Sequence, residues 1–255
     1  LIGLGVGAGL LVLAGILAVV FLAGGGVGIS KKDYQDANMK AEEMALKGLD
    51  SSGDFIIITY VSAYGTQYTL DDAQKNLDSY KKLLDEVKSM KALNDNDIKA
   101  AFGDYKKKAD DYIKFADDYL SSAKKVIVAL NKCTDDGASV SVTGSTVASL
   151  GSAVATCKSA MSDGKSVADP DLKKLAEVYY DYMVELESIV GQASVFSSND
   201  YSAAATLRNK MYDAQDSVIA TAKDVNSNIK KRYDAADLKP EDHTKIEEVM
   251  SKKVS

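Results

Sequence analysis

Hydrophobic and polar positions divide the chain into two unequal parts. Residues 1–23 read LIGLGVGAGLLVLAGILAVVFLA and are wholly apolar or glycine. A helix of that length rises about 34 Å, enough to cross a hydrocarbon layer of about 30 Å. All 31 basic and 37 acidic residues lie further along the chain. We therefore expect a retained N-terminal hydrophobic helix followed by a polar domain.

The strongest periodic pattern of the polar part lies between Asp95 and Leu130. Apolar or small residues recur there in alternating steps of four and three. A heptad seam of this kind predicts a long helix that packs at a shallow angle against its neighbours. The seam consists of Ile98, Phe102, Tyr105, Ala109, Tyr112, Ala116, Tyr119, Ala123, Val126 and Leu130.

Similar, shorter seams predict the other helices. They cover 31–49, 69–90, 147–161, 172–196 and 207–229, with a short amphipathic helix after Pro240. The breaks between them are short, and short connections make sequential helices antiparallel neighbours. The sequence thus predicts an all-α protein in which a long N-terminal hydrophobic helix precedes an up-down antiparallel helical bundle. Its expected parts are residues 1–30 (hydrophobic helix and glycine-rich hinge), 31–239 (exported bundle) and 240–255 (short C-terminal helix or tail).

Capping residues mark several of the predicted helix starts. Ser30 precedes the first helix, and Thr69 with Asp72 resembles a capping box. Residues 94–97 read NDND and resemble the start of a calcium loop, but the loop's sixth-position glycine is missing, which favours N-capping. Asp169 precedes Pro170, and proline is favoured at the first helical position. The segment 55–61, rich in β-formers, is predicted to be helical or irregular because no partner strand is visible.

The glycines of the hydrophobic segment are regularly spaced. Gly3, Gly5, Gly7 and Gly9 form two overlapping G-x-x-x-G pairs. Small residues four apart let apolar helices approach closely, which makes these glycines candidate contacts for assembly between copies of the chain. The alternative is that glycine is simply frequent in membrane helices. The pattern alone leaves both interpretations open.

The two cysteines are candidates for a disulfide. Cys133 ends the long heptad helix, and Cys157 lies on the apolar face of the next predicted helix. An antiparallel hairpin of these helices could bring the two sulfurs within bonding distance. The alternative is a pair of buried thiols in a reducing cytosol. We favour the disulfide, which would place the domain outside the cytoplasm, at the cell surface.

Composition argues against several classes of function. The net charge of −6 disfavours nucleic-acid binding, which needs a basic face. One histidine and two cysteines provide no dense ligand set, so we expect neither a metal site nor a cofactor. The sequence 164–166, GKS, lacks the glycine that a phosphate-binding loop requires at position 159. His243 is expected to be solvated. No catalytic motif is visible, and we do not expect an enzyme.

The layout of the first residues resembles type IV pilins. The resemblance covers Leu1 to about Ile29: a chain start other than methionine, as in a processed product or a fragment, and an uncharged apolar helix before a polar exported domain. Most such pilins carry a glutamate at the fifth mature position, where this chain has Gly5. The resemblance implies a structural subunit of an extracellular pilus-like filament, held in the membrane before assembly and then associating with other copies through its N-terminal helix.

Two other classes of protein fit the same layout. One is a single-pass, membrane-anchored extracytoplasmic bundle, similar in general layout to LemA-like proteins and chemoreceptor ligand domains, that binds a ligand or a partner. The other is a subunit of a membrane complex whose apolar helix packs against partner chains. No motif in the sequence selects between these classes.

Overall fold

The computed structural model describes residues 28–58, 67–135, 147–193 and 201–255. In these ranges the protein is all-α, and its helices pack as a bundle. The predicted N-terminal hydrophobic helix, residues 1–23, lies outside the described residues. The elements are α1 (Lys31–Ile58), α2 (Gln67–Ser89), the 3₁₀ helix η1 (Lys91–Asn94), α3 (Asn96–Asp135), α4 (Val147–Gly164), α5 (Pro170–Ala193), α6 (Tyr201–Ala236) and α7 (Pro240–Val254).

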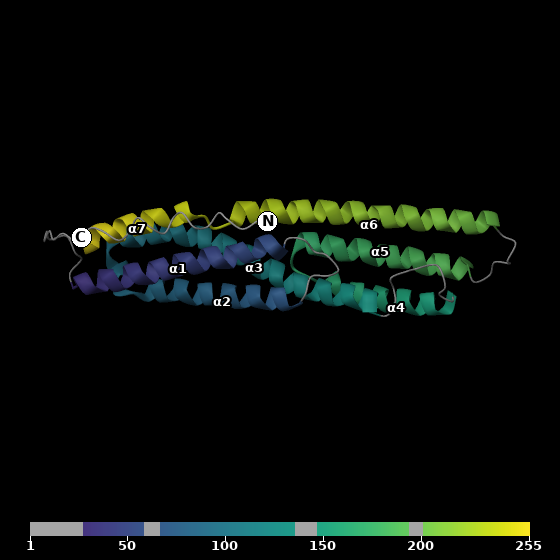
Figure 1. The fold of residues 1–255 in the computed structure, drawn as a ribbon, viewed down its shortest axis with the longest axis horizontal. Coiled ribbons are helices and arrows are strands. Elements are labelled where there is room, and N and C mark those ends of the chain that lie inside the picture. The colour runs from purple at the N-terminus through teal and green to yellow at the C-terminus, as the bar shows by residue number, and fades with distance from the viewer. Residues whose placement is uncertain (1–27, 59–66, 136–146, 194–200) are drawn as a thin grey trace, which may run out of the picture.

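The bundle is an elongated rod in which two groups of helices share α3 (Figure 1). In the first half of the rod, α1, α2 and α7 surround the beginning of α3. In the second half, α4, α5 and α6 surround its end. At 1.5 Å per residue, the 40 residues of α3 extend about 60 Å. This helix is therefore long enough to contribute to both halves.

The predicted heptad seam forms the core along α3. All its members from Ile98 to Leu130 are at most 5% exposed, which confirms the prediction. The seam residues of α2 (Leu77, Tyr80, Leu84 and Val87) are equally buried. On α6 the predicted seam is less deeply buried, since Met211, Ala214 and Ala222 are only partly covered. The core thus centres on α3, with α6 along its margin.

Helix starts follow the predicted capping residues at three places. The backbone N–H of Asp33 donates to Ser30 Oγ (3.2 Å), while Asp33 Oδ2 accepts from the backbone N–H of Ser30 (2.6 Å), a reciprocal capping box before α1. Asp95 Oδ1 accepts the N–H groups of Asp97 (2.9 Å) and Ile98 (3.4 Å) at α3. Asp169 Oδ1 likewise accepts two backbone N–H groups, those of Asp171 and Leu172, at the start of α5. The first residue of α5 is Pro170. These side chains satisfy backbone donors that a helix start leaves without intrahelical partners.

Two predicted helix boundaries were wrong. We expected the first helix to end at Leu49, before the turn-like residues 50–53, but α1 continues to Ile58. Ser51 and Ser52 are fully buried there, and their hydroxyls bond to side chains of other helices. These tertiary hydrogen bonds outweigh the preference of serine for turns. The helix α2 begins at Gln67, two residues before the predicted cap at Thr69.

None of the described helices combines the length and the apolar character that crossing a bilayer would require.

A close approach of helices in the first half depends on Gly48 of α1. A Cβ atom at this position would lie 2.9 Å from Tyr80 Cε2 and 3.2 Å from Leu238 Cδ1. Contacts this short require the neighbours to move. The glycine therefore allows α1 to lie against α2 and against the segment that leads into α7.

We predict that Gly48→Ala destabilises the protein. Overpacking costs about 1–3 kcal/mol, which exceeds the gain of about 1 kcal/mol from the higher helix propensity of alanine. Urea unfolding followed by circular dichroism measures the difference. Gly103→Ala is the matched control, because a Cβ there meets no atom within 4 Å. It should be neutral or stabilising. Equal effects of the two changes would contradict the close packing at Gly48.

Candidate functional site

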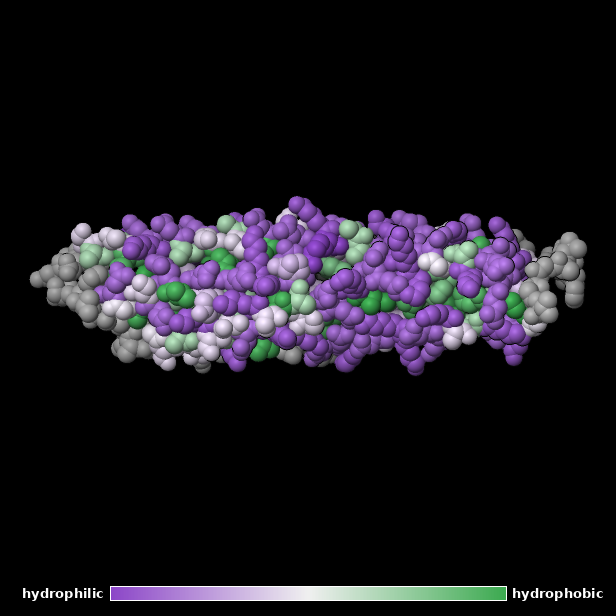
Figure 2. Space-filling view, turned by 180° about the vertical axis from the view of Figure 1, so that it is seen from behind, coloured by the Kyte–Doolittle hydropathy of each residue, from purple (hydrophilic) through white to green (hydrophobic). Residues whose placement is uncertain are grey.

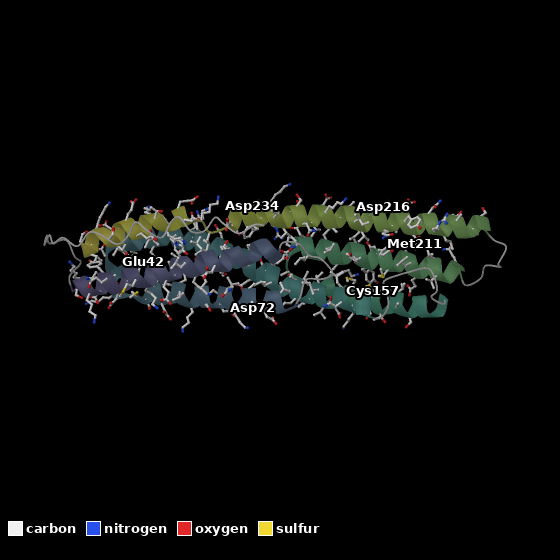
Figure 3. The ribbon with its side chains drawn as sticks, in the orientation of Figure 1. Glu42, Asp72, Cys157, Met211, Asp216 and Asp234 are labelled. Carbon is white, nitrogen blue, oxygen red and sulfur yellow. A yellow bond between two sulfur atoms is a disulfide. The ribbon has the colours of Figure 1, made fainter. Side chains whose placement is uncertain are left out.

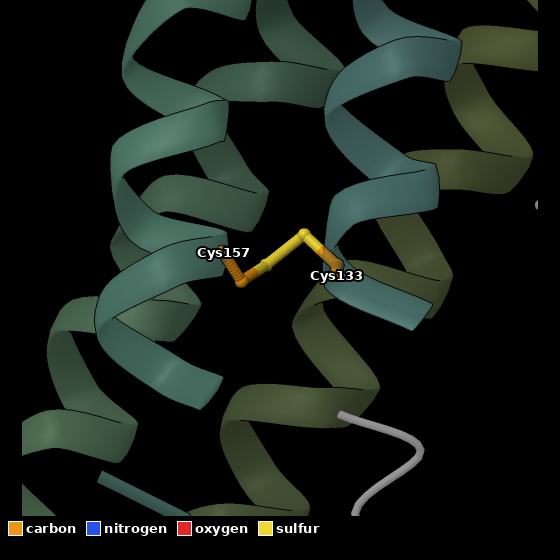
Figure 4. The surroundings of a disulfide bond; sticks show 2 residues. All are labelled: Cys133 and Cys157. Atoms are coloured by element: carbon orange, nitrogen blue, oxygen red, sulfur yellow. A yellow bond between two sulfur atoms is a disulfide. The ribbon is translucent and has the colours of Figure 1, made fainter. Parts of the chain in front are cut away.

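A disulfide joins the end of α3 to α4, as predicted. Cys133 and Cys157 are bonded, and their Cα atoms lie 4.5 Å apart (Figure 4). Both residues are buried, at 9% and 0% exposed. In the chain-entropy model a bridge across a segment of this length stabilises the fold by about 3 kcal/mol. The bond therefore secures the hairpin that begins the second half of the rod.

The predicted assembly residues Gly3, Gly5, Gly7 and Gly9 lie outside the described residues. Their proposed contacts with other copies stay a prediction. The acidic pairs 110–111 and 117–118 of α3 are exposed or half-buried. The acidic side chains labelled in Figure 3, Glu42, Asp72, Asp216 and Asp234, likewise lie along the outside of the rod.

Where the two halves meet, the core contains a cluster of charged residues. Asp169 is fully buried and accepts a hydrogen bond from Arg232 Nη2 of α6 (2.7 Å). Asp171 is 9% exposed and forms an ion pair with the same nitrogen (2.8 Å). The backbone N–H of Asp169 donates to the buried Ser122 hydroxyl of α3 (2.9 Å). The Arg232 guanidinium also lies 5.6 Å from the centre of the Phe115 ring. We name Ser122, Asp169, Asp171 and Arg232 the junction cluster.

A second group of polar contacts links α1 to the same region. Tyr233 of α6 donates its hydroxyl to the backbone carbonyl of Ser52 (3.0 Å) and also lies near Asp237 Oδ1 (3.1 Å). The Ser52 hydroxyl donates to Asp237 as well. Ser51 shares a hydrogen bond of 2.8 Å with the Tyr112 hydroxyl of α3. Burial raises the pKa of Tyr233 to about 12, so its hydroxyl stays protonated and able to donate.

The residues of the junction cluster have structural roles. Asp169 caps α5 and binds Arg232, so that one buried carboxylate holds α5 and α6 together. Ser122 adds α3 to the same cluster. Breaking a buried ion pair is costly because it leaves an uncompensated charge in the core. The cluster therefore fixes how the three helices are aligned along the rod.

A third polar group lies at the end of the rod where α1 begins. The carboxylate of Asp95, 4% exposed, accepts from the Tyr34 hydroxyl (3.0 Å) and pairs with Lys253 of α7 (3.0 Å). Burial alone would raise the pKa of Asp95, but the bonds from Lys253 and Tyr34 hold it below its ordinary value. This carboxylate thus joins the starts of α1 and α3 to the end of α7.

The prediction that His243 is solvated was wrong. It lies on α7, is 3% exposed, and its ring centre is 4.6 Å from that of Tyr105. Neither ring nitrogen has a hydrogen-bond partner among the described residues. Burial lowers its pKa to about 4, against the opposing effect of the Asp242 carboxylate. The ring therefore packs in its neutral form as part of the contact between α7 and α3.

The sequence 164–166, which lacks a glycine of the phosphate-binding loop, lies at the end of α4. There the Lys165 ammonium lies 3.4 Å from the centre of the Tyr180 ring. No group of three or more histidine, cysteine or carboxylate side chains in the described residues is arranged to hold a metal ion. The face shown in Figure 2 is largely hydrophilic, with small hydrophobic groups scattered along it.

Comparison with known proteins assigns the chain to no family. No protein-family model matches the sequence, and neither curated proteins nor solved structures give a significant match.

The junction cluster yields a stability prediction. Replacing Arg232 by glutamine leaves the buried carboxylates of Asp169 and Asp171 without their cation. We expect the free energy of unfolding to fall by about 2–3 kcal/mol. This is at the low end for a buried pair, because the Arg232 side chain is one-third exposed. Lys231→Gln is the matched control, because Lys231 is next to Arg232 in the sequence and its side chain is exposed. This change should alter the free energy of unfolding by less than about 0.5 kcal/mol. Equal urea midpoints for the two variants would show that the cluster does not hold the junction.

His243 yields a pH prediction. Its folded pKa of about 4 lies below its unfolded value of about 6.5, so the unfolded chain binds the proton first as the pH falls. Stability from this residue is complete above pH 6.5 and is lost toward pH 4. Between pH 7 and pH 5 the loss is about 2 kcal/mol.

Urea unfolding of the parent protein and of His243→Phe at both pH values checks this. Phenylalanine retains the aromatic packing and cannot be protonated, so the variant should lose less stability than the parent on acidification. Parallel losses in the two proteins would contradict the assignment of this pH dependence to His243.

Proposed function

We propose that the chain is an exported structural protein in which residues 31–255 form a rigid rod held at a membrane by the apolar residues 1–23. The observation that carries this proposal is the buried disulfide between Cys133 and Cys157. Disulfides persist in oxidising compartments and are rare in the cytosol. Together with the apolar segment, the bond favours a location outside the cytoplasm.

The geometry of the rod supports attachment at its tip. The helix α1 begins at one end of the long axis, where α7 also ends (Figure 1). The contacts of Asp95 with Tyr34 and Lys253 place both helix ends beside the start of α3. A chain anchored through residues 1–23 therefore enters the rod at its end. In this arrangement the second half, with α4, α5 and α6, is displayed furthest from the attachment point.

Fractionation of the cells that produce the protein tests this proposal. We expect the full chain to stay with membranes after alkaline extraction, and protease added outside to digest the helical domain. Deletion of residues 1–23 should abolish membrane association. In denaturant without reductant, both cysteines should resist alkylation. A chain found in the cytosol with two free thiols would overturn the proposal.

Self-assembly into a pilus-like filament is the second candidate function. The spacing of Gly3, Gly5, Gly7 and Gly9 favours it, because such glycines let apolar helices pack closely. In a filament, the apolar segments of many copies would form the core and the rods would lie outside. In the membrane-anchored protein, a single apolar segment would instead be surrounded by lipid.

A Gly7→Leu variant separates these two functions. Leucine adds bulk at the proposed helix contact, so a filament-forming protein should be exported normally yet fail to assemble, as seen by negative-stain electron microscopy. Gly25→Leu, outside the G-x-x-x-G pairs, is the control and should leave filaments intact. A single helix in lipid tolerates leucine at position 7 well. Normal filaments from Gly7→Leu would therefore refute close packing at these glycines.

A further inference from the structure

The outside of α6 carries two large hydrophobic side chains. Tyr212 is 50% exposed and Ile219 is 44% exposed. They are seven residues apart in the sequence, so they lie on the same side of the helix, two turns from each other. The buried residues of α6, among them Leu207, Val218 and Val225, lie on another side. The described helices thus leave Tyr212 and Ile219 about half exposed.

Opposite charges flank Tyr212 along this side of the helix. Arg208 lies one turn before Tyr212 and Asp216 one turn after it, and both are exposed. Neither has a hydrogen bond or an ion pair among the described residues. The carboxylate of Asp216 lies along the outside of the rod (Figure 3). We name Arg208, Tyr212, Asp216 and Ile219 the outer face of α6.

This order of charges distinguishes Tyr212 from the other large hydrophobic residues that are exposed in the described structure. Single exposed apolar side chains are common on protein surfaces and need no explanation. Only Tyr212 among them has opposite charges four residues before and four residues after it. The corresponding flanking residues are Gln35 and Glu43 at Met39, Glu42 and Asp50 at Leu46, Lys124 and Lys132 at Val128, Tyr180 and Ser188 at Val184, and Gln215 and Lys223 at Ile219.

A two-fold axis at Tyr212 makes the outer face complementary to itself. In the commonest class of helix packing, rows of side chains four residues apart lie against each other at a crossing angle of about −50°. When a second α6 runs in the opposite direction, Arg208 of each copy faces Asp216 of the other. The two Tyr212 rings meet at the axis. Ala205, which is as far before Tyr212 as Ile219 is after it, leaves room for Ile219 of the second copy.

Other arrangements of two α6 helices bring like charges together. In a parallel pair in register, Arg208 would face Arg208 and Asp216 would face Asp216. In an antiparallel pair with Tyr212 opposite Ile219, Arg208 would face Lys223. Like charges in contact oppose association. The charge pattern therefore favours the antiparallel pair centred on Tyr212.

We propose that the outer face of α6 binds the same face of a second copy of this chain, with the two helices antiparallel. The contact is confined to one helix of each copy, so it is smaller than the standard stable interface of about 1,600 Å². A single pair is therefore weak. Rods held in large numbers at a surface gain strength because many pairs form at once.

Pairing of this kind joins two rods at the ends where α6 begins. The helix α6 starts at the end of the rod opposite the start of α1 and runs toward the first half (Figure 1). Antiparallel α6 helices therefore place the two first halves on opposite sides of the contact. Rods anchored in one flat membrane point the same way and cannot pair like this, whereas rods from two facing membranes can. This consequence rests on the proposed membrane anchorage, but the pairing itself does not.

Charge-reversal variants test the contact. Arg208→Asp brings carboxylates face to face, and Asp216→Arg brings guanidinium groups face to face. Each variant alone should therefore raise the dissociation constant of the pair at least about tenfold. An equal mixture of the two variants restores both ion pairs and should associate as the parent does, which also shows that each variant is folded. Glu42→Arg is the matched control: it reverses an exposed charge beside the exposed Leu46 of α1 and should leave the constant unchanged.

Sedimentation velocity of the full chain in non-ionic detergent measures these constants. Association through residues 1–23 contributes equally to all the proteins, because none of the changes lies there. Equal constants for the parent and both single variants would overturn the contact between copies and leave the outer face to a different partner. Absence of rescue in the mixture, while circular dichroism shows both variants to be helical, would overturn the antiparallel pair as well.

Vesicles separate failure of the pairing from failure of the anchorage. The full-length parent reconstituted into phosphatidylcholine vesicles should cluster them, as measured by light scattering. Vesicles with either single variant should stay dispersed, and mixing the two kinds should cluster them. A protein that pairs in detergent but does not insert into vesicles would refute the anchorage alone. A protein that inserts but pairs in neither assay would refute the contact of the outer face alone.

Discussion

The tyrosine hydroxyls on the buried seam of α3 must be satisfied inside the core, and much of the polar structure follows from that constraint. Tyr105, Tyr112 and Tyr119 alternate with alanines along the seam and are at most 2% exposed. This alternation of large and small side chains lets neighbouring helices interdigitate. A buried hydroxyl without a partner would cost free energy. Tyr105 therefore bonds to Tyr80 of α2 at 2.5 Å, and Tyr112 bonds to Ser51 of α1.

In the junction cluster, buried charged groups must likewise have partners inside the core. Asp169 is fully buried, yet it receives two backbone N–H groups and the Arg232 guanidinium. A buried ion pair contributes little net stability compared with apolar residues, because desolvation offsets its attraction. Its effect is mainly on alignment: a shift of α6 along α5 would separate the charges, whereas a purely apolar contact would tolerate the shift. The apolar seam thus stabilises the bundle, and the junction cluster fixes how α6 is aligned along α5.

The sequence predicted those features that depend on local spacing. The α3 seam, the caps at Ser30, Asp95 and Asp169, and the pairing of the two cysteines could be inferred because each needs only neighbouring residues or one hairpin. The buried polar contacts could not. Ser52 and Tyr233 are 181 positions apart, and Asp169 and Arg232 are 63 apart.

His243 shows why such contacts escape a reading of the sequence. It lies among charged residues that are typical of a solvated face, and only the neighbouring helices bury it. A signal was present in the spacing: Ile246 and Met250, three and seven positions after His243, are buried with it on one face of α7. A histidine on such an apolar stripe is a candidate for the core.

The chain order of the two halves has a consequence for how the protein is built. The helices of the second half come from one continuous stretch, residues 96–236, whereas α7, the last helix, packs against α1, the first. Contacts between distant segments carry a larger loop-closure cost and form more slowly than local ones. During synthesis the second half can fold before α7 has emerged. Until then α1 and α2 expose apolar surface to proteases and to other chains. Folding of the rod therefore ends at the tip where α1 begins.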